Sequence, residues 1–179
     1  RPYFVKIDKI NKLCSSMLEA KVHTELRGFL REQQQPIWTH HLTMARLISR
    51  ALRLHRSALI QTGSTVSCYS YSYLTPALLS EQPLLLVAPS AIQKRLLEID
   101  IPKLQEWLQI SKRIFTDTSD FLTANRQGLL MLSPQRWLSD RLSNPNTLSL
   151  PTLIDQAEDL GDWTKTFLTV EITPYDWTY

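Results

Sequence analysis

This 179-residue sequence has few of the residues that build cross-linked or metal-bound small domains. It contains two cysteines, Cys14 and Cys68, which are too few for a disulfide framework, a four-cysteine zinc site or an iron–sulfur cluster. Free cysteines are typical of a reducing compartment, so a cytoplasmic location is expected. There is no run of about 18 apolar residues, so no membrane-spanning helix is expected. The composition therefore predicts a globular protein without a membrane partner.

Lysine is missing from a long stretch of the chain, since none occurs from Val22 to Gln93. Arginine takes its place as the basic residue. Residues 27–56 carry six arginines and one glutamate, a local charge of +5, whereas residues 151–179 carry six acids and Lys165, a local charge of −5. The first region is expected to attract phosphate and the second to repel it.

Apolar periodicity predicts helices over residues 15–33 and 40–53, followed by short apolar strands that alternate with helices. The expected strands are residues 57–61, 84–88, 113–116, 129–132 and 150–154, and the expected helices between them are 71–79, 90–108 and 133–142. Pro102 is expected to kink or break the helix over 90–108. Residues 167–172 alternate and are expected to form a last strand or an extended tail. This order favours an α/β fold in which helices flank a parallel sheet.

The polar loop over residues 62–70 joins a predicted strand to a predicted helix, as in proteins that wrap a phosphate loop around a nucleotide. The candidate nucleotide-binding residues are Gly63, Ser64, Thr65, Ser67 and Ser70. The loop has one glycine, and Cys68 or Tyr69 occupies the position where a phosphate-binding lysine is expected. An ordinary connecting loop is therefore the alternative interpretation.

Two other predicted strands also end on polar residues. Ser90 and Gln93 follow the strand over 84–88 in the first turn of a helix, where a nucleic-acid phosphate can bind. Asp155 ends the strand over 150–154, at the position where nucleotide hydrolases hold magnesium. Asp155 is thus the candidate metal ligand, and a capped strand end is the alternative, because one carboxylate is a poor site.

In this order and spacing, the three segments resemble the first RecA-like motor domain of the DinG/XPD-type superfamily 2 DNA helicases. The resemblance runs from about residue 36 to residue 163. It is carried by the predicted strand over 58–61, residues 73–79 around Pro76, residues 87–93, residues 128–142 and the acidic box over 155–158. It implies an N-terminal helical segment over 1–35 and a partial motor domain over 36–179, within a longer protein that has a second motor domain. It also implies ATP and magnesium as ligands and DNA as a partner.

The sequence departs from this family at the residues that hydrolyse ATP. The loop lacks Gly-Lys-Thr, and Gln156 replaces the glutamate that orients the attacking water. No cysteine lies between Leu84 and Tyr179, so the iron–sulfur cluster of many members is not expected. Loss of the lysine removes strong charge-assisted contacts, and loss of the acid removes a catalytic factor of ~10²–10⁴.

We therefore expect a helicase-related domain with decayed ATPase motifs that binds nucleic acid or a protein partner. One alternative is an active ATP-dependent helicase whose full-length form uses an atypical phosphate loop. Another is a purely structural or interaction module. Arg46, Arg50 and Arg53 share one side of a predicted helix and are expected to contact DNA, the alternative being an ordinary solvated face.

Overall fold

A computed structural model describes residues 5–33, 39–62, 69–143 and 149–170, and for residues 5–17 it describes only the helical backbone. Three helices precede the first strand: α1 (Val5–Glu32), α2 (His41–Leu54) and α3 (Ser70–Leu79). The elements that follow are β1 (Leu84–Val87), α4 (Ser90–Arg95), η1 (Leu96–Asp100), α5 (Ile101–Leu108), β2 (Ile114–Phe115), α6 (Thr118–Thr123), β3 (Leu129–Leu132), α7 (Pro134–Ser143), β4 (Thr152–Ile154), η2 (Ala157–Asp159) and α8 (Leu160–Leu168). Within the described ranges, no helix combines the length and the apolar character needed to span a membrane.

The sheet has four parallel strands in the order β2-β3-β1-β4. Strand β1 pairs with β3 through Leu84↔Leu129 and with β4 through Leu85↔Thr152. Every residue of β1 and β3 is buried, because helices cover both faces of a parallel sheet, and this explains their uninterrupted apolar sequences. The predicted α/β fold, with a parallel sheet flanked by helices and preceded by a helical segment, is confirmed.

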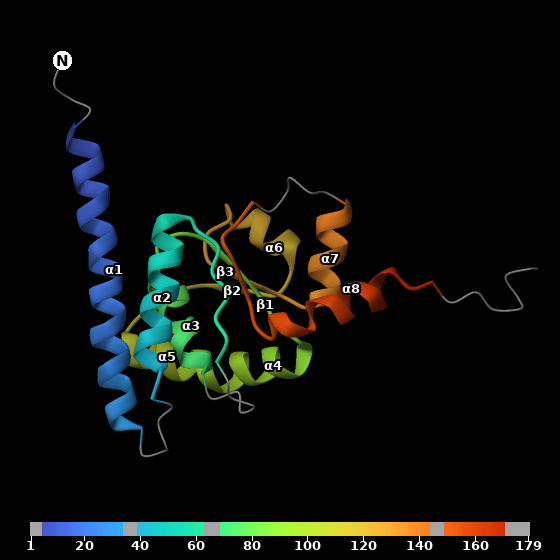
Figure 1. Cartoon of the computed structure of the whole chain (residues 1–179), viewed down its shortest axis with the longest axis horizontal. Coiled ribbons are helices and arrows are strands. Elements are labelled where there is room, and N and C mark those ends of the chain that lie inside the picture. The colour runs from blue at the N-terminus through green and yellow to red at the C-terminus, as the bar shows by residue number, and fades with distance from the viewer. Residues whose placement is uncertain (1–4, 34–38, 63–68, 144–148, 171–179) are drawn as a thin grey trace, which may run out of the picture.

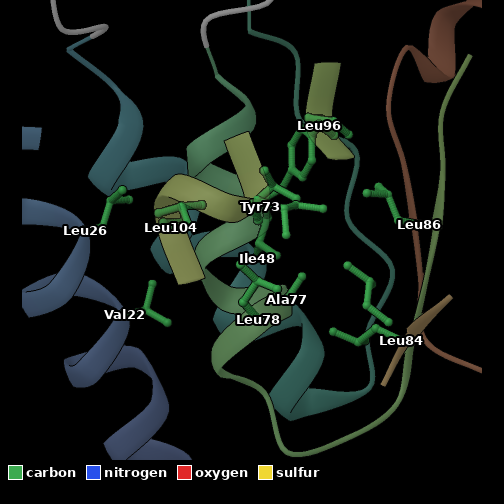
Figure 2. Close-up of a cluster of buried hydrophobic side chains, with 14 of the residues drawn as sticks. Val22, Leu26, Ile48, Tyr73, Ala77, Leu78, Leu84, Leu86, Leu96 and Leu104 are labelled. Carbon is green, nitrogen blue, oxygen red and sulfur yellow. The ribbon is translucent and has the colours of Figure 1, made fainter. Parts of the chain in front are cut away.

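Successive residues of β1 contribute to two different hydrophobic clusters, as expected for a strand with a side-chain period of two. Leu84 and Leu86 belong to a large cluster with helices α1, α2, α3 and α5, whereas Leu85 and Val87 pack with Phe121 of α6. Figure 1 shows α1, α2 and α3 on one side of the sheet and α6 and α7 on the other. Figure 2 shows the large cluster, in which side chains from α1, α2, α3 and β1 converge.

The predicted helix over residues 90–108 is present, and its irregular turn lies just before Pro102. Helix α4 continues through the π-helical turn η1 into α5 without a break in the chain. Pro102 has no N–H to bond the carbonyl four residues earlier, and a widened turn accommodates this missing bond. The wide turn also carries the buried Asp100 into the interior, with 2% of its surface exposed.

The C-terminal end of α3 is capped by Lys112, which comes from the segment before β2. Its Nζ donates hydrogen bonds to the carbonyl oxygens of Ala77 (2.8 Å), Ser80 (2.7 Å) and Gln82 (3.2 Å). Burial lowers the pKa of Lys112 to about 8, which still leaves the amine mostly protonated at neutral pH. The cation satisfies the last carbonyls of the helix, which have no intrahelical partner, and complements the negative end of the helix dipole.

Replacing Lys112 with methionine is expected to lower the free energy of unfolding by about 1–2 kcal/mol, because partly buried carbonyls lose their donor while the apolar stem is kept. Urea denaturation followed by circular dichroism measures this change. Lys103→Met, at an exposed position on α5, is the matched control and is expected to change stability by less than about 0.5 kcal/mol. Equal effects of the two substitutions would contradict the capping role.

The strand predicted over residues 57–61 is wrong. Helix α2 ends at Leu54, His55 turns the chain with a φ of 49°, and residues 56–62 form no regular element. Leu59 is 87% exposed, and Ile60 alone in this segment packs against the large cluster. A strand would need a partner and a covered face for its short apolar run, and this segment has neither. The expected strand before the phosphate loop is therefore absent.

Residues 167–172, predicted as a last strand or an extended tail, form no strand in their described part, and Thr169 and the exposed Val170 agree with the extended tail. Phe167 and Leu168 end helix α8, and residues 171–172 lie outside the described residues. Leu160, Trp163 and Phe167 follow a helical spacing on α8, which outweighs the local alternation.

Helix α6 was not predicted, because it has only six residues. Its start is capped by the Asp117 side chain, which accepts a hydrogen bond from Ser119 N.

Candidate functional site

The candidate site lies at the carboxyl edge of the sheet, where ligand sites of parallel α/β proteins occur. Asp155 follows β4, and its backbone N–H donates to Val87 O at the end of β1 (2.9 Å). Helix α4 begins at Ser90, two residues after Ala88. The carbonyl of Ala88 lies at the same edge of the sheet. The structure thus brings together the strand end carrying Asp155 and the turn that leads to Ser90 and Gln93.

Asp155 is held by two tyrosines from the first turns of α3. Tyr69 Oη donates to Oδ1 at 2.8 Å and Tyr73 Oη donates to Oδ2 at 2.7 Å. These tyrosines are four residues apart, so they lie on the same side of the helix. Burial, and then the charge of Asp155, raise the pKa of Tyr73 well above its ordinary value, so its hydroxyl stays protonated and donates. Both oxygens of a carboxylate that is 6% exposed therefore accept hydrogen bonds.

A second buried carboxylate, Asp100, lies on the other side of the start of α3. Ser70 Oγ donates to its Oδ2 at 2.9 Å, and Arg95 Nε lies 3.3 Å from the same oxygen. Burial, and then the charge of Asp100, raise the pKa of Tyr71 to about 12. The N-terminal turn of α3 is thus fixed by two aspartates, one from β4 and one from the π-helical turn.

A cavity of about 170 Å³ lies beside Asp155 and its two tyrosines. Its lining comes from the start of α3, from α4 and η1, and from the end of β4: Tyr69, Ser70, Tyr73, Ala91, Ile92, Arg95, Leu96 and Asp155. Binding sites for drug-sized molecules usually have volumes of roughly 300–1,000 Å³. The described walls therefore leave room for a group much smaller than a nucleotide.

The residues predicted to bind nucleotide are only partly accounted for. Gly63, Ser64, Thr65 and Ser67 lie outside the described residues. Ser70 lines the cavity, but it is 4% exposed and its hydroxyl is bonded to Asp100.

The other predicted residues are dispersed. Ser90 is exposed at the start of α4, and Gln93 Nε2 donates to Ala88 O at 2.8 Å. Gln156 adopts a left-handed conformation, with a φ of 59°, in the turn after β4. The three arginines of α2 are not among the cavity residues: Arg46 and Arg50 are exposed, and Arg53 forms an ion pair with Glu19 of α1.

The described residues are a poor fit to the magnesium and ATP that the resemblance implies. Asp155 is a single buried carboxylate whose two oxygens each accept a tyrosine hydrogen bond, whereas Mg²⁺ is usually held by one or two carboxylates together with several waters. Among the described residues, no group of three or more His, Cys, Asp or Glu side chains could hold a metal ion. The sequence also offers no lysine between Val22 and Gln93 for phosphate.

Sequence reasoning missed the partners of Asp155 and the whole Asp100 group. The four-residue spacing of Tyr69 and Tyr73 was a usable signal, because it aligns two hydroxyls on one side of a helix. Asp100 between Ile99 and Ile101 was another, since a carboxylate within an apolar run needs donors when it is buried.

Searches against protein-family models, curated proteins and solved structures found no match for this chain.

Proposed function

We propose that this chain is a helicase-related RecA-like domain whose ATPase motifs have decayed and whose remaining role is to bind nucleic acid or a protein partner. The observation that carries the proposal is the engagement of Asp155 by Tyr69 and Tyr73. Asp155 at the end of β4 lies beside the turn from β1 into α4, which agrees with two of the three segments of the resemblance, although the strand expected before the phosphate loop is absent. In this chain that acid serves as an acceptor for tyrosines.

The chemistry of the site argues against hydrolysis of ATP. A phosphate-binding lysine, a magnesium-binding acid and a water-orienting acid act together on a transferred phosphoryl group. Here no lysine is available in the surrounding stretch, Asp155 is buried and accepts from two tyrosines, and Gln156 cannot accept a proton as a base. A binding role needs none of these three groups, so it is compatible with the residues present.

Millimolar Mg-ATP is expected to leave the melting temperature of the protein unchanged. A ligand at 100 times its dissociation constant adds about 2.7 kcal/mol to the free energy of unfolding, which corresponds to roughly 5–10 °C for a chain of this size. Differential scanning fluorimetry with and without Mg-ATP makes this measurement, and phosphate release with and without single-stranded DNA accompanies it. The Asp155→Asn variant is the control for specific binding.

A melting shift that is present in the parent chain and lost in Asp155→Asn would overturn the proposal and favour a functional nucleotide site. DNA-stimulated phosphate release by the parent would support the active-helicase alternative. Failure to bind any nucleic acid or protein would leave the structural-module alternative.

A further inference from the structure

Helices α1 and α2 form an antiparallel pair whose register is fixed by one ion pair. Arg53 Nε of α2 lies 2.9 Å from Glu19 Oε1 of α1, so these two residues lie at the same level. Figure 1 shows that the two helices run side by side in opposite directions. Because each helix rises about 1.5 Å per residue, Arg27 of α1 lies at nearly the level of Arg46 of α2.

Four arginines lie on the outer side of this pair. Each residue turns an α-helix by about 100°, so Arg27 and Arg31 lie on the same flank of α1 as Glu19 but further from the core. By the same rotation, Arg46 and Arg50 lie on the same flank of α2 as Arg53 but further from the core. All four are exposed, whereas Val22, Leu26, Ala45 and Ile48 on the inner side are buried. We call Arg27, Arg31, Arg46 and Arg50 the arginine face. It extends over roughly 14 Å along the helix axes.

In the part of the chain that the structure describes, no acid lies on the arginine face to balance its charge. Glu19 is the nearest carboxylate on this side, and Arg53 already pairs with it. Glu25 and Glu32 lie roughly 100–160° around α1 from Arg27 and Arg31, at a rotation of about 100° per residue. Among the side chains that the structure describes, none of the four arginines is in an ion pair. Four adjacent uncompensated guanidinium groups create a local potential that attracts a polyanion.

We propose that the arginine face binds the phosphodiester backbone of a nucleic acid, without reading its sequence. Guanidinium groups match phosphate oxygens in a two-point geometry, and arginines four residues apart are spaced by about 6 Å along a helix. The described part of this face has no exposed aromatic side chain for stacking on bases or inserting into lipid. This inference rests on the proposed binding role and assigns it a surface and a chemical class of partner.

The test is the salt dependence of binding to a fluorescent duplex of roughly 20 base pairs, measured by anisotropy with the full chain. Four phosphate contacts predict a slope of log affinity against log salt of about −3.6, which is roughly a 150-fold loss between 50 and 200 mM salt. Arg27→Gln/Arg46→Gln is expected to halve that slope, so that the loss falls to roughly 10-fold. Arg113→Gln/Arg141→Gln removes the same charge at exposed positions outside this face and is expected to keep the parent slope.

Each result decides the matter. A reduced slope in the arginine-face variant alone supports the inference, and melting temperatures of both variants exclude misfolding as its cause. An equal reduction in both variants indicates attraction by net charge and overturns it. No duplex binding at about 50 mM salt overturns it as well, as does binding only to phosphatidylserine vesicles or to polyglutamate. Duplex binding with the same salt slope in the arginine-face variant as in the parent would remove the surface assignment while leaving the proposed binding role intact.

Discussion

Replacing Asp155 with alanine is expected to lower the free energy of unfolding by about 2–5 kcal/mol. The substitution leaves the hydroxyls of Tyr69 and Tyr73 without their acceptor, and a buried hydroxyl that loses a charged partner costs about 1–3 kcal/mol. Tyr73 is 4% exposed, so water cannot readily replace the carboxylate there. Urea denaturation at neutral pH measures the change, and it amounts to a large share of the roughly 5–15 kcal/mol that stabilises a typical domain.

The same experiment separates a structural aspartate from a catalytic one. Acids kept for metal binding or catalysis often reduce the stability of the fold, so their removal tends to be neutral or stabilising. An aspartate kept as a tyrosine acceptor behaves in the opposite way. A neutral or stabilising Asp155→Ala substitution would therefore contradict the structural role and revive the magnesium interpretation.

Two further variants localise the effect. Glu158→Ala removes an exposed acid three residues along the chain and is expected to change stability by less than about 0.5 kcal/mol. In a double-mutant cycle, Tyr73→Phe and Asp155→Ala are expected to show a coupling of about 1–3 kcal/mol, since each removes the same contact. Additive effects would show that the two side chains do not stabilise each other.

The sheet could be predicted from sequence because its signal is local. The runs that become β1 and β3 contain only buried leucine, valine and methionine, as strands covered on both faces require. Residues 57–61 also form a short apolar run, but they contain few apolar residues. Whether Leu59 is covered depends on which elements pack nearby, and in this fold it is exposed. An isolated short apolar run does not carry that information.

The candidate site could be predicted only in part, because its partners are far apart in sequence. Asp155 could be placed at the end of a predicted strand, but its position beside the turn after β1 depends on the pairing of β4 with β1, which the sequence does not specify. Its two donors lie 86 and 82 residues earlier, and the pairing depends on how α3 packs across the sheet. The loop composition did indicate weak phosphate chemistry, but it could not indicate that Tyr69 and Tyr73 would occupy the acid.

Stability is expected to fall as the pH is lowered from about 6.5 towards 4, because of His41. This side chain is 3% exposed at the start of α2, and its Nδ1 lies 2.6 Å from Ser72 Oγ of α3. Burial lowers the pKa of His41 to about 4 from the ordinary value of 6.5. Between these values the unfolded chain binds a proton that the folded chain does not, so acid favours unfolding.

The size of this loss of stability follows from the width of the pH interval between the folded and unfolded pKa values of His41. Each pH unit contributes up to about 1.4 kcal/mol, which sets a limit of about 3 kcal/mol over the whole window. We expect about 2 kcal/mol, because the surroundings screen part of the charge. Above about pH 6.5 both states are neutral and the contribution of His41 to stability is constant; below about pH 4 both states are protonated and the loss is complete.

The difference in unfolding free energy between the parent chain and His41→Gln isolates this effect from the titration of the carboxyl groups. That difference is expected to shrink steadily from pH 6.5 to pH 4, since only the parent has the buried imidazole. His23→Gln is the matched control, because His23 lies exposed on α1, and its difference from the parent is expected to be constant. A constant difference for His41→Gln as well would mean that the imidazole is hydrated in the folded chain, and that the contact between α2 and α3 at Ser72 is looser than its geometry indicates.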